Sequence, residues 1–205
     1  HIRLSLKAQS VTQGVERNAA QVECLLVPSL DVPVGPGLGR DSSARQKLAA
    51  ALATPVPIVL DADALHLVEP AVLRHRSAPT LLTPHKGEFA ALFGDAGGGT
   101  KLDRTRHAAA QTGATIIFKG ADSVVAAPDG RALLSAGSPA WLASAGTGDV
   151  LAGIAGAMLA RGLAPLEAAE AALWLHKRAA ALAGPALIAD DMLLALPAAF
   201  AESTR

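Results

Sequence analysis

Residues 143–153 combine residue types that can bind a phosphate with one that can move a proton. Gly146, Thr147 and Gly148 directly precede an apolar run typical of a helix, and a helix N-terminus carries unpaired N–H groups and a partial positive charge. Asp149 follows them and, as an anion, is ill suited to attracting a phosphate. We therefore interpret Gly146–Gly148 as an anion hole and Asp149 as a general base, which indicates phosphoryl transfer. In the alternative, Thr147 or Asp149 only caps the helix.

Two further polar segments follow apolar runs that indicate strands. The sequence Gly-Pro-Gly-Leu-Gly at 35–39 permits either a tight strand-to-helix turn or the close approach of a ribose or phosphate. Asp61 and Asp63 follow the run at 56–60, and ligands of open α/β sheets bind at the carboxyl ends of strands. Asp63 is the better candidate for a helix N-cap, and Asp61 is the better candidate for a functional role.

Two more polar segments, 83–88 and 118–123, also follow apolar runs that indicate strands. His85 and Glu88 are three residues apart and would share one face of a first helical turn. Glu88 could support a metal-bound phosphate, or it could only be an acid that favours a helix N-terminus. Lys119 could reach a nucleotide phosphate or be an ordinary solvated charge. The repeated placement of polar segments at strand ends favours one shared site.

Short apolar runs alternate with helical patterns, which predicts βα units around a mainly parallel sheet. The expected strands are 30–34, 56–60, 80–83 and 115–118, and the expected helices between them are 42–53, 64–75, 86–93 and 102–112. A turn at 128–130 predicts an antiparallel hairpin of strands 123–127 and 131–135, and helices are expected at 149–161, 165–183 and 191–196. We expect a three-layer α/β/α sandwich in a single domain spanning 1–205.

The composition argues against a charged or membrane partner. The 18 basic and 18 acidic residues balance, so no bulk charge draws the chain to nucleic acid or to an anionic membrane. The longest uncharged apolar run, 150–160, is far shorter than the roughly 20 residues of a membrane span. The lone Cys24 cannot form an internal disulfide, which fits a reducing cytoplasm. We expect a cytoplasmic protein with small-molecule partners, no nucleic acid and no membrane.

Together, the motifs at 35–39, 61–65, 83–88, 119–120 and 142–153 resemble those of the ADP/ATP-dependent NAD(P)H-hydrate dehydratases, which belong to the ribokinase-like superfamily. The motifs keep the family's order and approximate spacing. The resemblance implies a ribokinase-like fold and a nicotinamide-cofactor repair enzyme that acts on 6S-hydrated NADH or NADPH. The carbon-6 hydroxyl would be phosphorylated at the expense of ADP or ATP, and elimination of phosphate would restore the double bond.

The resemblance also implies a role for each motif. Asp149 would be the base near the substrate hydroxyl, and Gly146–Gly148 would hold the transferring phosphate. Gly37 and His85 would contact the hydrated dinucleotide, as would Asp149. Glu88 would support Mg²⁺ through water. The residues that would contact the adenine nucleotide are Lys119, Gly120, Ala121, Asp122, Ser123 and Gly148.

The resemblance further implies a homo-oligomer, with a tetramer favoured, and many family members carry a fused epimerase domain. Two departures stand out. No glycine-rich turn occurs among the 34 residues before Gly35, which predicts an N-terminally truncated domain. Such a domain would keep the half of the site that binds the adenine nucleotide and lose part of the wall around the hydrated dinucleotide. It would also expose a sheet edge prone to association. Ala140-Trp141 stands where many members of the family have a smaller Gly-Met pair, and this difference would alter local packing more than chemistry.

Two other functions remain open. A ribokinase-like kinase for a sugar or vitamin precursor would use the same anion hole and the same Asp149 base. His85 favours the dehydratase, because the sugar kinases of the superfamily more often have asparagine at that place. The second alternative is an inactive nucleotide-binding fragment.

Overall fold

The computed structural model describes residues 32–94 and 98–203, and these residues form a six-stranded sheet in the order β1-β2-β3-β4-β5-β6. Strands β1 to β4 are parallel, with Val34, Leu60 and Leu82 in register across β1, β2 and β3, and β4, β5 and β6 are antiparallel. The strands are β1 Val32–Val34, β2 Ile58–Leu60, β3 Thr80–Leu82, β4 Thr115–Phe118, β5 Ser123–Ala126 and β6 Ala132–Ser135. The predicted parallel sheet with its hairpin is confirmed; residues 30–31 of the first expected strand lie outside the described ranges.

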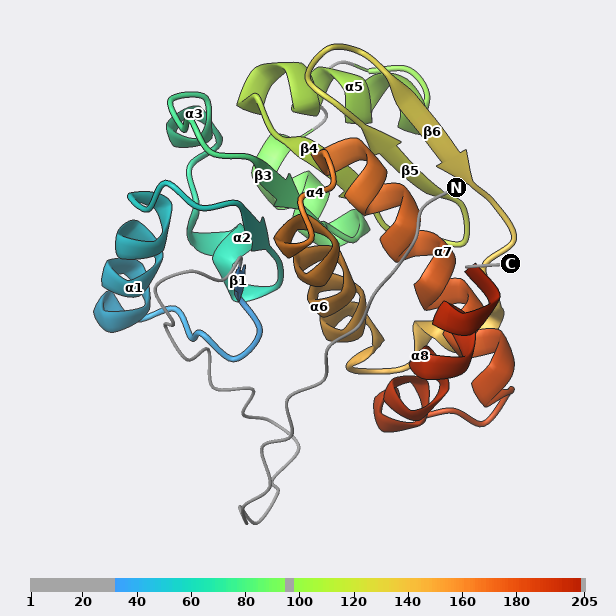
Figure 1. Ribbon diagram of the computed structural model, residues 1–205. Helices are drawn as coiled ribbons and strands as arrows, with labels where there is room; N and C mark the ends of the chain where they lie inside the picture. The colour runs from blue at the N-terminus through green and yellow to red at the C-terminus, as the bar shows by residue number, and fades with distance from the viewer. Residues whose placement is uncertain (1–31, 95–97, 204–205) are drawn as a thin grey trace.

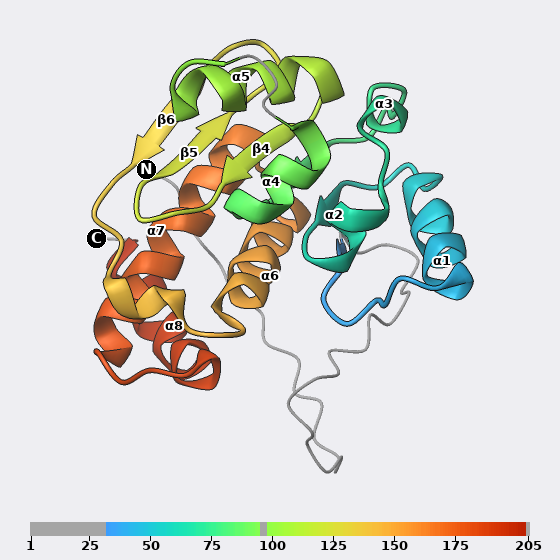
Figure 2. The same ribbon diagram turned by 180° about the vertical axis from the view of Figure 1, so that it is seen from behind.

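Helices cover both faces of the sheet (Figures 1 and 2). The helices are α1 Ser42–Leu52, α2 Asp63–Leu67, α3 Pro70–Leu73, α4 Lys86–Phe93, α5 Lys101–Thr112, the 3₁₀ turn η1 Ala140–Ala143, α6 Thr147–Ala160, α7 Pro165–Ala183 and α8 Ala189–Ser203. Alternate strand residues point to opposite faces, so Val59 and Leu81 pack with α6, α7 and α8, whereas Leu60 and Leu82 pack with the helices from α1 to α5. The predicted three-layer α/β/α sandwich is confirmed.

The expectation of one helix over 64–75 is wrong. The chain forms α2 and α3, which are separated by extended backbone at Val68 (ψ 137°) and Glu69 (ψ 123°). Pro70 explains the break, because the proline ring disfavours helical backbone at the preceding residue and removes an N–H donor. The last helix is also longer than expected and continues through Pro197 to Ser203. Of the helices in the described part of the chain, none is long and apolar enough to cross a bilayer.

Gly35 allows the turn after β1 to lie against the end of β2. Its φ is +143°, and a Cβ atom at this position would lie 1.6 Å from the Asp61 carbonyl oxygen. We expect Gly35→Ala to lower the free energy of unfolding by roughly 3 kcal/mol or more, because the clash involves backbone that cannot move aside. Gly39→Ala is the control: Gly39 has a φ of +78° but no atom within 4 Å of the added Cβ, so a cost of about 1–2 kcal/mol is expected. Urea unfolding measures both, and equal losses would contradict this account.

Candidate active site

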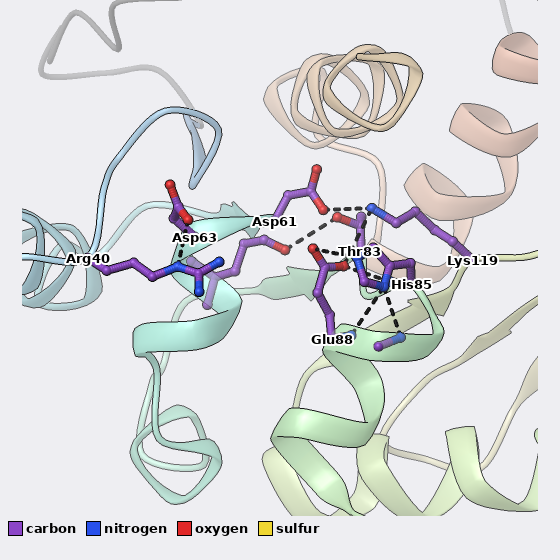
Figure 3. Close-up of polar contacts among 9 residues, drawn as sticks. Arg40, Asp61, Asp63, Thr83, His85, Glu88 and Lys119 are labelled. Atoms are coloured by element: carbon purple, nitrogen blue, oxygen red, sulfur yellow. Dashed lines mark hydrogen bonds and ion pairs between the residues drawn. The ribbon is translucent and has the colours of Figure 1, made fainter. Parts of the chain in front are cut away.

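Polar side chains gather at the carboxyl ends of three neighbouring parallel strands (Figure 3). Asp61 follows β2, His85 follows β3, and Lys119 follows β4, while Glu88 lies in the first turn of α4. Ala62, beside Asp61, has a φ of 47° and is the non-glycine residue with positive φ among those described. Backbone strain of this kind concentrates at functional sites. The structure therefore brings the predicted side chains together at one sheet edge, and their role as a site stays a prediction.

Lys119 forms a buried ion pair with Asp61. The Lys119 Nζ atom lies 2.8 Å from Asp61 Oδ1, and the two side chains are 18% and 2% exposed. Glu88 Oε2 lies 3.9 Å from the same Nζ atom. A carboxylate as buried as that of Asp61 needs a partner of opposite charge. The alternative in which Lys119 is an ordinary solvated charge is therefore wrong.

The ion pair lies against the start of α6. A Cβ atom on Gly148 would lie 3.3 Å from Lys119 Nζ and 3.9 Å from Asp61 Oδ2. The structure therefore brings the predicted anion hole at Gly146–Gly148 together with the strand-end cluster, although 29 residues separate Lys119 from Gly148 along the chain. An anion bound to the α6 N-terminus would meet both helix N–H groups and the Lys119 charge.

The alternative in which Thr147 or Asp149 caps α6 is wrong. The N-cap is Gly146, with a φ of 82°, and no side chain caps the helix. The Thr147 hydroxyl instead contacts the carbonyl oxygens of Leu142 and Ser144, both at 2.8 Å. In the described part of the chain, the Gly148 N–H has no hydrogen-bond acceptor. This donor at the helix N-terminus is available to a ligand.

Asp149 is exposed, and its pKa lies above the usual aspartate range. Partial burial is the largest cause of this upward shift, the negative charges of Asp61 and Glu88 add to it, and the positive charge of Lys119 opposes it. A carboxylate of raised basicity that stays open to solvent at a helix N-terminus suits the role of general base. The geometry therefore agrees with the predicted role of Asp149.

His85 and Glu88 hold the start of α4 through reciprocal hydrogen bonds. His85 Nδ1 accepts from the N–H groups of Gly87 (2.9 Å) and Glu88 (3.2 Å), and Glu88 Oε2 accepts from the His85 N–H at 2.8 Å. His85 Nε2 lies 3.4 Å from Glu88 Oε1. Glu88 therefore stabilises the helix N-terminus as a first-turn acid, which is one of the two roles that the sequence left open. The His85 ring is exposed at the edge of the cluster and is accessible to a ligand.

Asp63 does not cap α2, which is a correction of the expectation. Ala62 occupies the N-cap position, and the Asp63 carboxylate accepts from the Gly39 N–H (3.0 Å) and from Arg40 Nε (2.9 Å). The Arg40 hydrogen bond is the largest cause of the lowered pKa of Asp63. These bonds tie the glycine turn to α2.

Gly37 lies in that glycine turn and has a φ of 69°. The Leu38 N–H donates to the Gly35 carbonyl and closes the turn. The segment therefore forms the tight turn that the sequence offered, and a ligand contact at Gly37 stays a prediction.

The predicted nucleotide segment 119–123 forms a compact loop between β4 and β5. Ser123 Oγ donates to the Gly120 carbonyl at 3.2 Å, whereas Ala121 and Asp122 are exposed. Lys101, which the sequence did not single out, donates from Nζ to the carbonyl oxygens of Lys119 (3.3 Å) and Asp122. Its ammonium group thus supports the loop from α5. Only the folding of α5 onto β4 and β5 reveals this contact.

His176 is a second residue that sequence reasoning missed. It lies on α7, is buried, and places Nε2 2.8 Å from the Thr147 carbonyl oxygen at the start of α6. Burial is the main reason why the pKa of His176 falls to about 4; the hydrogen bond to Thr147 opposes this downward shift, and the Lys119 charge adds to it. The available sequence signal was a histidine among the alanines and leucines of the apolar face of α7.

The low pKa of His176 predicts that the protein loses stability in acid. The unfolded chain, with a histidine pKa of 6.5, binds this proton as the pH falls from 6.5 toward 4, whereas the folded chain does not. Stability from this group is therefore complete above pH 6.5 and is lost as the pH falls through that window, by up to roughly 3 kcal/mol. We expect His176→Gln to flatten this part of the pH dependence in urea unfolding. A variant with the same slope as the wild type would contradict the assignment.

The carboxylates of the site do not form a metal cage. Among residues 32–94 and 98–203, no group of three or more histidine, cysteine, aspartate or glutamate side chains is placed to hold a metal ion. Both Glu88 oxygens lie near His85, and Asp61 Oδ1 is paired with Lys119. Direct coordination by Glu88 is therefore disfavoured, and its predicted contact through water remains a prediction.

Comparison with known proteins identifies the family. A family model described as NAD(P)H-hydrate dehydratase matches residues 9–196, which is most of the chain. The chain belongs to the NAD(P)H-hydrate dehydratase family. This assignment agrees with the resemblance drawn from the motifs around Lys119 and Asp149.

Individual members of the family support the assignment. The bifunctional NAD(P)H-hydrate repair enzyme Nnr of Mycobacterium leprae is 46% identical over 151 residues, which cover 73% of this chain and 32% of that enzyme. The ADP/ATP-dependent NAD(P)H-hydrate dehydratase of Bacillus subtilis, co-crystallised with ATP/Mg²⁺ and soaked with CoA, superimposes with a TM-score of 0.77 at 30% identity, covering 88% of this chain and 69% of that one. A ribokinase-like superfamily protein from Enterococcus faecalis gives a TM-score of 0.70 at 28% identity, and the match covers 81% of this chain and 61% of that protein. The ribokinase-like fold expected from the motifs is confirmed, and the chain spans about a third of the mycobacterial enzyme.

Proposed function

We propose that this chain carries the ADP- or ATP-dependent dehydratase activity of its family and restores 6S-hydrated NADH or NADPH. The observation that carries the proposal is the placement of Asp149. Its exposed, basic carboxylate lies at the N-terminus of α6, next to the open Gly148 N–H and close to the Lys119–Asp61 pair. A base, an anion site and a cation thus meet where a hydroxyl group could attack a phosphate.

The proposed chemistry has two steps. In the first, Asp149 accepts the proton of the carbon-6 hydroxyl while the hydroxyl oxygen forms a bond to the terminal phosphorus of the nucleotide. The bond from that phosphorus to the rest of the nucleotide breaks at the same time. In the second, the carbon–oxygen bond breaks, phosphate leaves with the bonding electrons, and the neighbouring carbon gives its proton to water, which restores the ring double bond. Phosphorylation is needed because hydroxide is a poor leaving group, whereas phosphate is a good one.

We place the adenine nucleotide along the loop 119–123 and at Gly148, and the hydrated dinucleotide beside Gly37 and His85. Ala121 and Asp122 are exposed residues of this loop, and the Lys119 ammonium group extends from the loop toward the start of α6. The exposed His85 ring follows β3 and the Gly37 turn follows β1, and these two strands lie on either side of β2. The two substrates would therefore meet at Asp149.

Mg²⁺ fits this site as a companion of the nucleotide. Magnesium binds through one or two carboxylates together with substrate phosphates and retains several waters. Asp61 Oδ2 and the Asp149 carboxylate are the oxygens beside the anion hole, and Glu88 would act through water. When bound, the ion would neutralise phosphate charge. A metal that arrives with the nucleotide is consistent with the absence of a three-ligand group among the described side chains.

The wider setting of the enzyme is also a proposal. The bifunctional M. leprae relative supports an epimerase domain in a longer chain, and the family resemblance supports a homo-oligomer, with a tetramer favoured. Large apolar side chains are exposed at Leu134, Leu193 and Leu194, which is consistent with contacts between subunits. The lone Cys24 supports a cytoplasmic location. Light scattering of the purified protein would measure the oligomeric state.

The proposed activity is tested by mixing the chain with hydrated NADH or NADPH, Mg²⁺ and either ADP or ATP. Reduced cofactor absorbs near 340 nm and the hydrate does not, so absorbance should rise only when nucleotide is present. Release of one phosphate per cofactor restored would complete the evidence. Formation of a stable phosphorylated product without a rise in absorbance would instead indicate a small-molecule kinase. Nucleotide binding without turnover of any substrate would indicate the inactive fragment.

A further inference from the structure

We propose that His176 is a positioning residue of the phosphate site: it holds the Thr147 carbonyl and thereby directs the Gly148 N–H toward the bound phosphate. This inference rests on the proposed function for the identity of the anion. His176 itself lies on α7, outside the anion hole, and reaches Thr147 from behind the first turn of α6. His176 therefore acts on the shape of the site and does not touch the ligand.

The direction of the His176 hydrogen bond follows from its surroundings. Nε2 lies 2.8 Å from a carbonyl oxygen, which can only accept, so this nitrogen must carry a proton. The ring is 7% exposed, and its burial keeps the pKa near 4, so the ring is neutral at physiological pH. The neutral tautomer with the proton on Nε2 is therefore the form that donates to Thr147.

Because the peptide bond is planar, a contact at the Thr147 carbonyl oxygen also affects the orientation of the N–H group on the other side of that bond. The Thr147 carbonyl and the Gly148 N–H belong to one rigid, trans peptide unit, in which the two groups point in nearly opposite directions. Thr147 is the first residue of α6, so the helix sets the general direction of this peptide, and the donor on the carbonyl oxygen restrains the direction of the N–H further. The Gly148 N–H has no acceptor among the described residues, and Lys119 Nζ lies 3.3 Å from the Cβ position of this glycine. The peptide is thus anchored on its carbonyl side and open on its N–H side.

The glycines beside Thr147 give this anchor its importance. Gly146 and Gly148 flank Thr147, and glycine backbones have more conformational freedom than those of other residues. The Thr147 hydroxyl contacts the carbonyls of Leu142 and Ser144, which attaches the segment to the preceding 3₁₀ turn. His176 attaches the same residue to α7. Two attachments from different directions hold a donor in place before the ligand arrives, which lowers the entropic cost of binding.

The test compares three variants of this chain by calorimetry with ADP or ATP. His176→Leu removes the donor while keeping an apolar side chain, and His176→Gln retains an N–H donor at a similar reach. We expect His176→Leu to weaken nucleotide affinity and turnover by about tenfold to a hundredfold, since small displacements in a site have effects of this size. His176→Gln should recover most of both. Thr112→Val, which removes a buried hydroxyl bonded to the Ala108 carbonyl on α5, is the control for lost stability and should leave affinity unchanged.

A second readout does not depend on the proposed reaction. In ¹H–¹⁵N spectra, the Gly148 amide of His176→Leu should shift and exchange faster with solvent, and adding inorganic phosphate should perturb it less than in the wild type. A wild-type Gly148 amide that responds to neither phosphate nor nucleotide would contradict the proposed function. An amide and an affinity that His176→Leu leaves unchanged would overturn the positioning role. Equal losses of affinity in His176→Leu and Thr112→Val would also overturn it.

Discussion

Replacing Asp149 with asparagine is expected to lower kcat by roughly 10²–10⁴-fold, the range typical of losing a general base. Asparagine keeps the size and polarity of the side chain but cannot accept the hydroxyl proton. Since no side chain caps α6, the substitution removes no capping hydrogen bond, although it removes the first-turn negative charge. Affinity for ADP or ATP should stay within a few fold or rise slightly, because one negative charge near the phosphates is lost.

Turnover of the Asp149→Asn protein is measured at saturating substrate and compared with Asp129→Asn. Asp129 lies in the exposed hairpin turn, at the opposite end of β5 from the loop 119–123, and bonds to Arg131, so the same chemical change should leave kcat unaffected there. A kcat for Asp149→Asn within a few fold of the wild type would exclude Asp149 as the base.

Replacing Lys119 with methionine is expected to have two separable effects. Stability should fall by roughly 3–5 kcal/mol, because the substitution leaves the buried Asp61 carboxylate without its cationic partner. Nucleotide affinity should fall by about 1–3 kcal/mol, because a charge-assisted contact to phosphate is lost. Urea unfolding measures the first effect and calorimetry the second.

The double variant Asp61→Asn, Lys119→Met separates these effects. Removing both charges avoids an unpaired buried carboxylate, so most of the lost stability should return. Nucleotide affinity should remain low, since the cation beside Gly148 is still missing. A double variant that recovers affinity as well would show that Lys119 acts only through the structure. Unchanged affinity in the single variant would lead to the same conclusion.

The sequence predicted the elements of this site better than their contacts. The end of β4 before Lys119 and the start of α4 after His85 were correctly predicted, because apolar runs and helix-start signals are local. Parallel strands end at one edge of the sheet, so the clustering of Asp61, His85 and Lys119 also followed from the pattern. Pro70 was the local signal that could have prevented the error of a single helix at 64–75.

What remained unpredicted depends on tertiary packing. The Asp63 side chain bonds to Gly39 and Arg40 instead of capping its own helix, and a residue of this type suits either role. His176 and Lys101 make their contacts to Thr147 and to the 119–123 loop from other helices. No local pattern fixes which side chain of one helix meets which carbonyl of another.

The proposed function requires that a phosphoryl group pass to the hydrated dinucleotide at the N-terminus of α6, with Asp149 as the base. A single-turnover experiment with ATP labelled at its terminal phosphate tests this claim directly. In the wild-type chain, label should appear first on the dinucleotide and then as free phosphate, in step with the absorbance of reduced cofactor. In Asp149→Asn, both substrates should bind without transfer of label. Direct release of labelled phosphate to water, with no labelled dinucleotide at any time while reduced cofactor forms, would contradict the account.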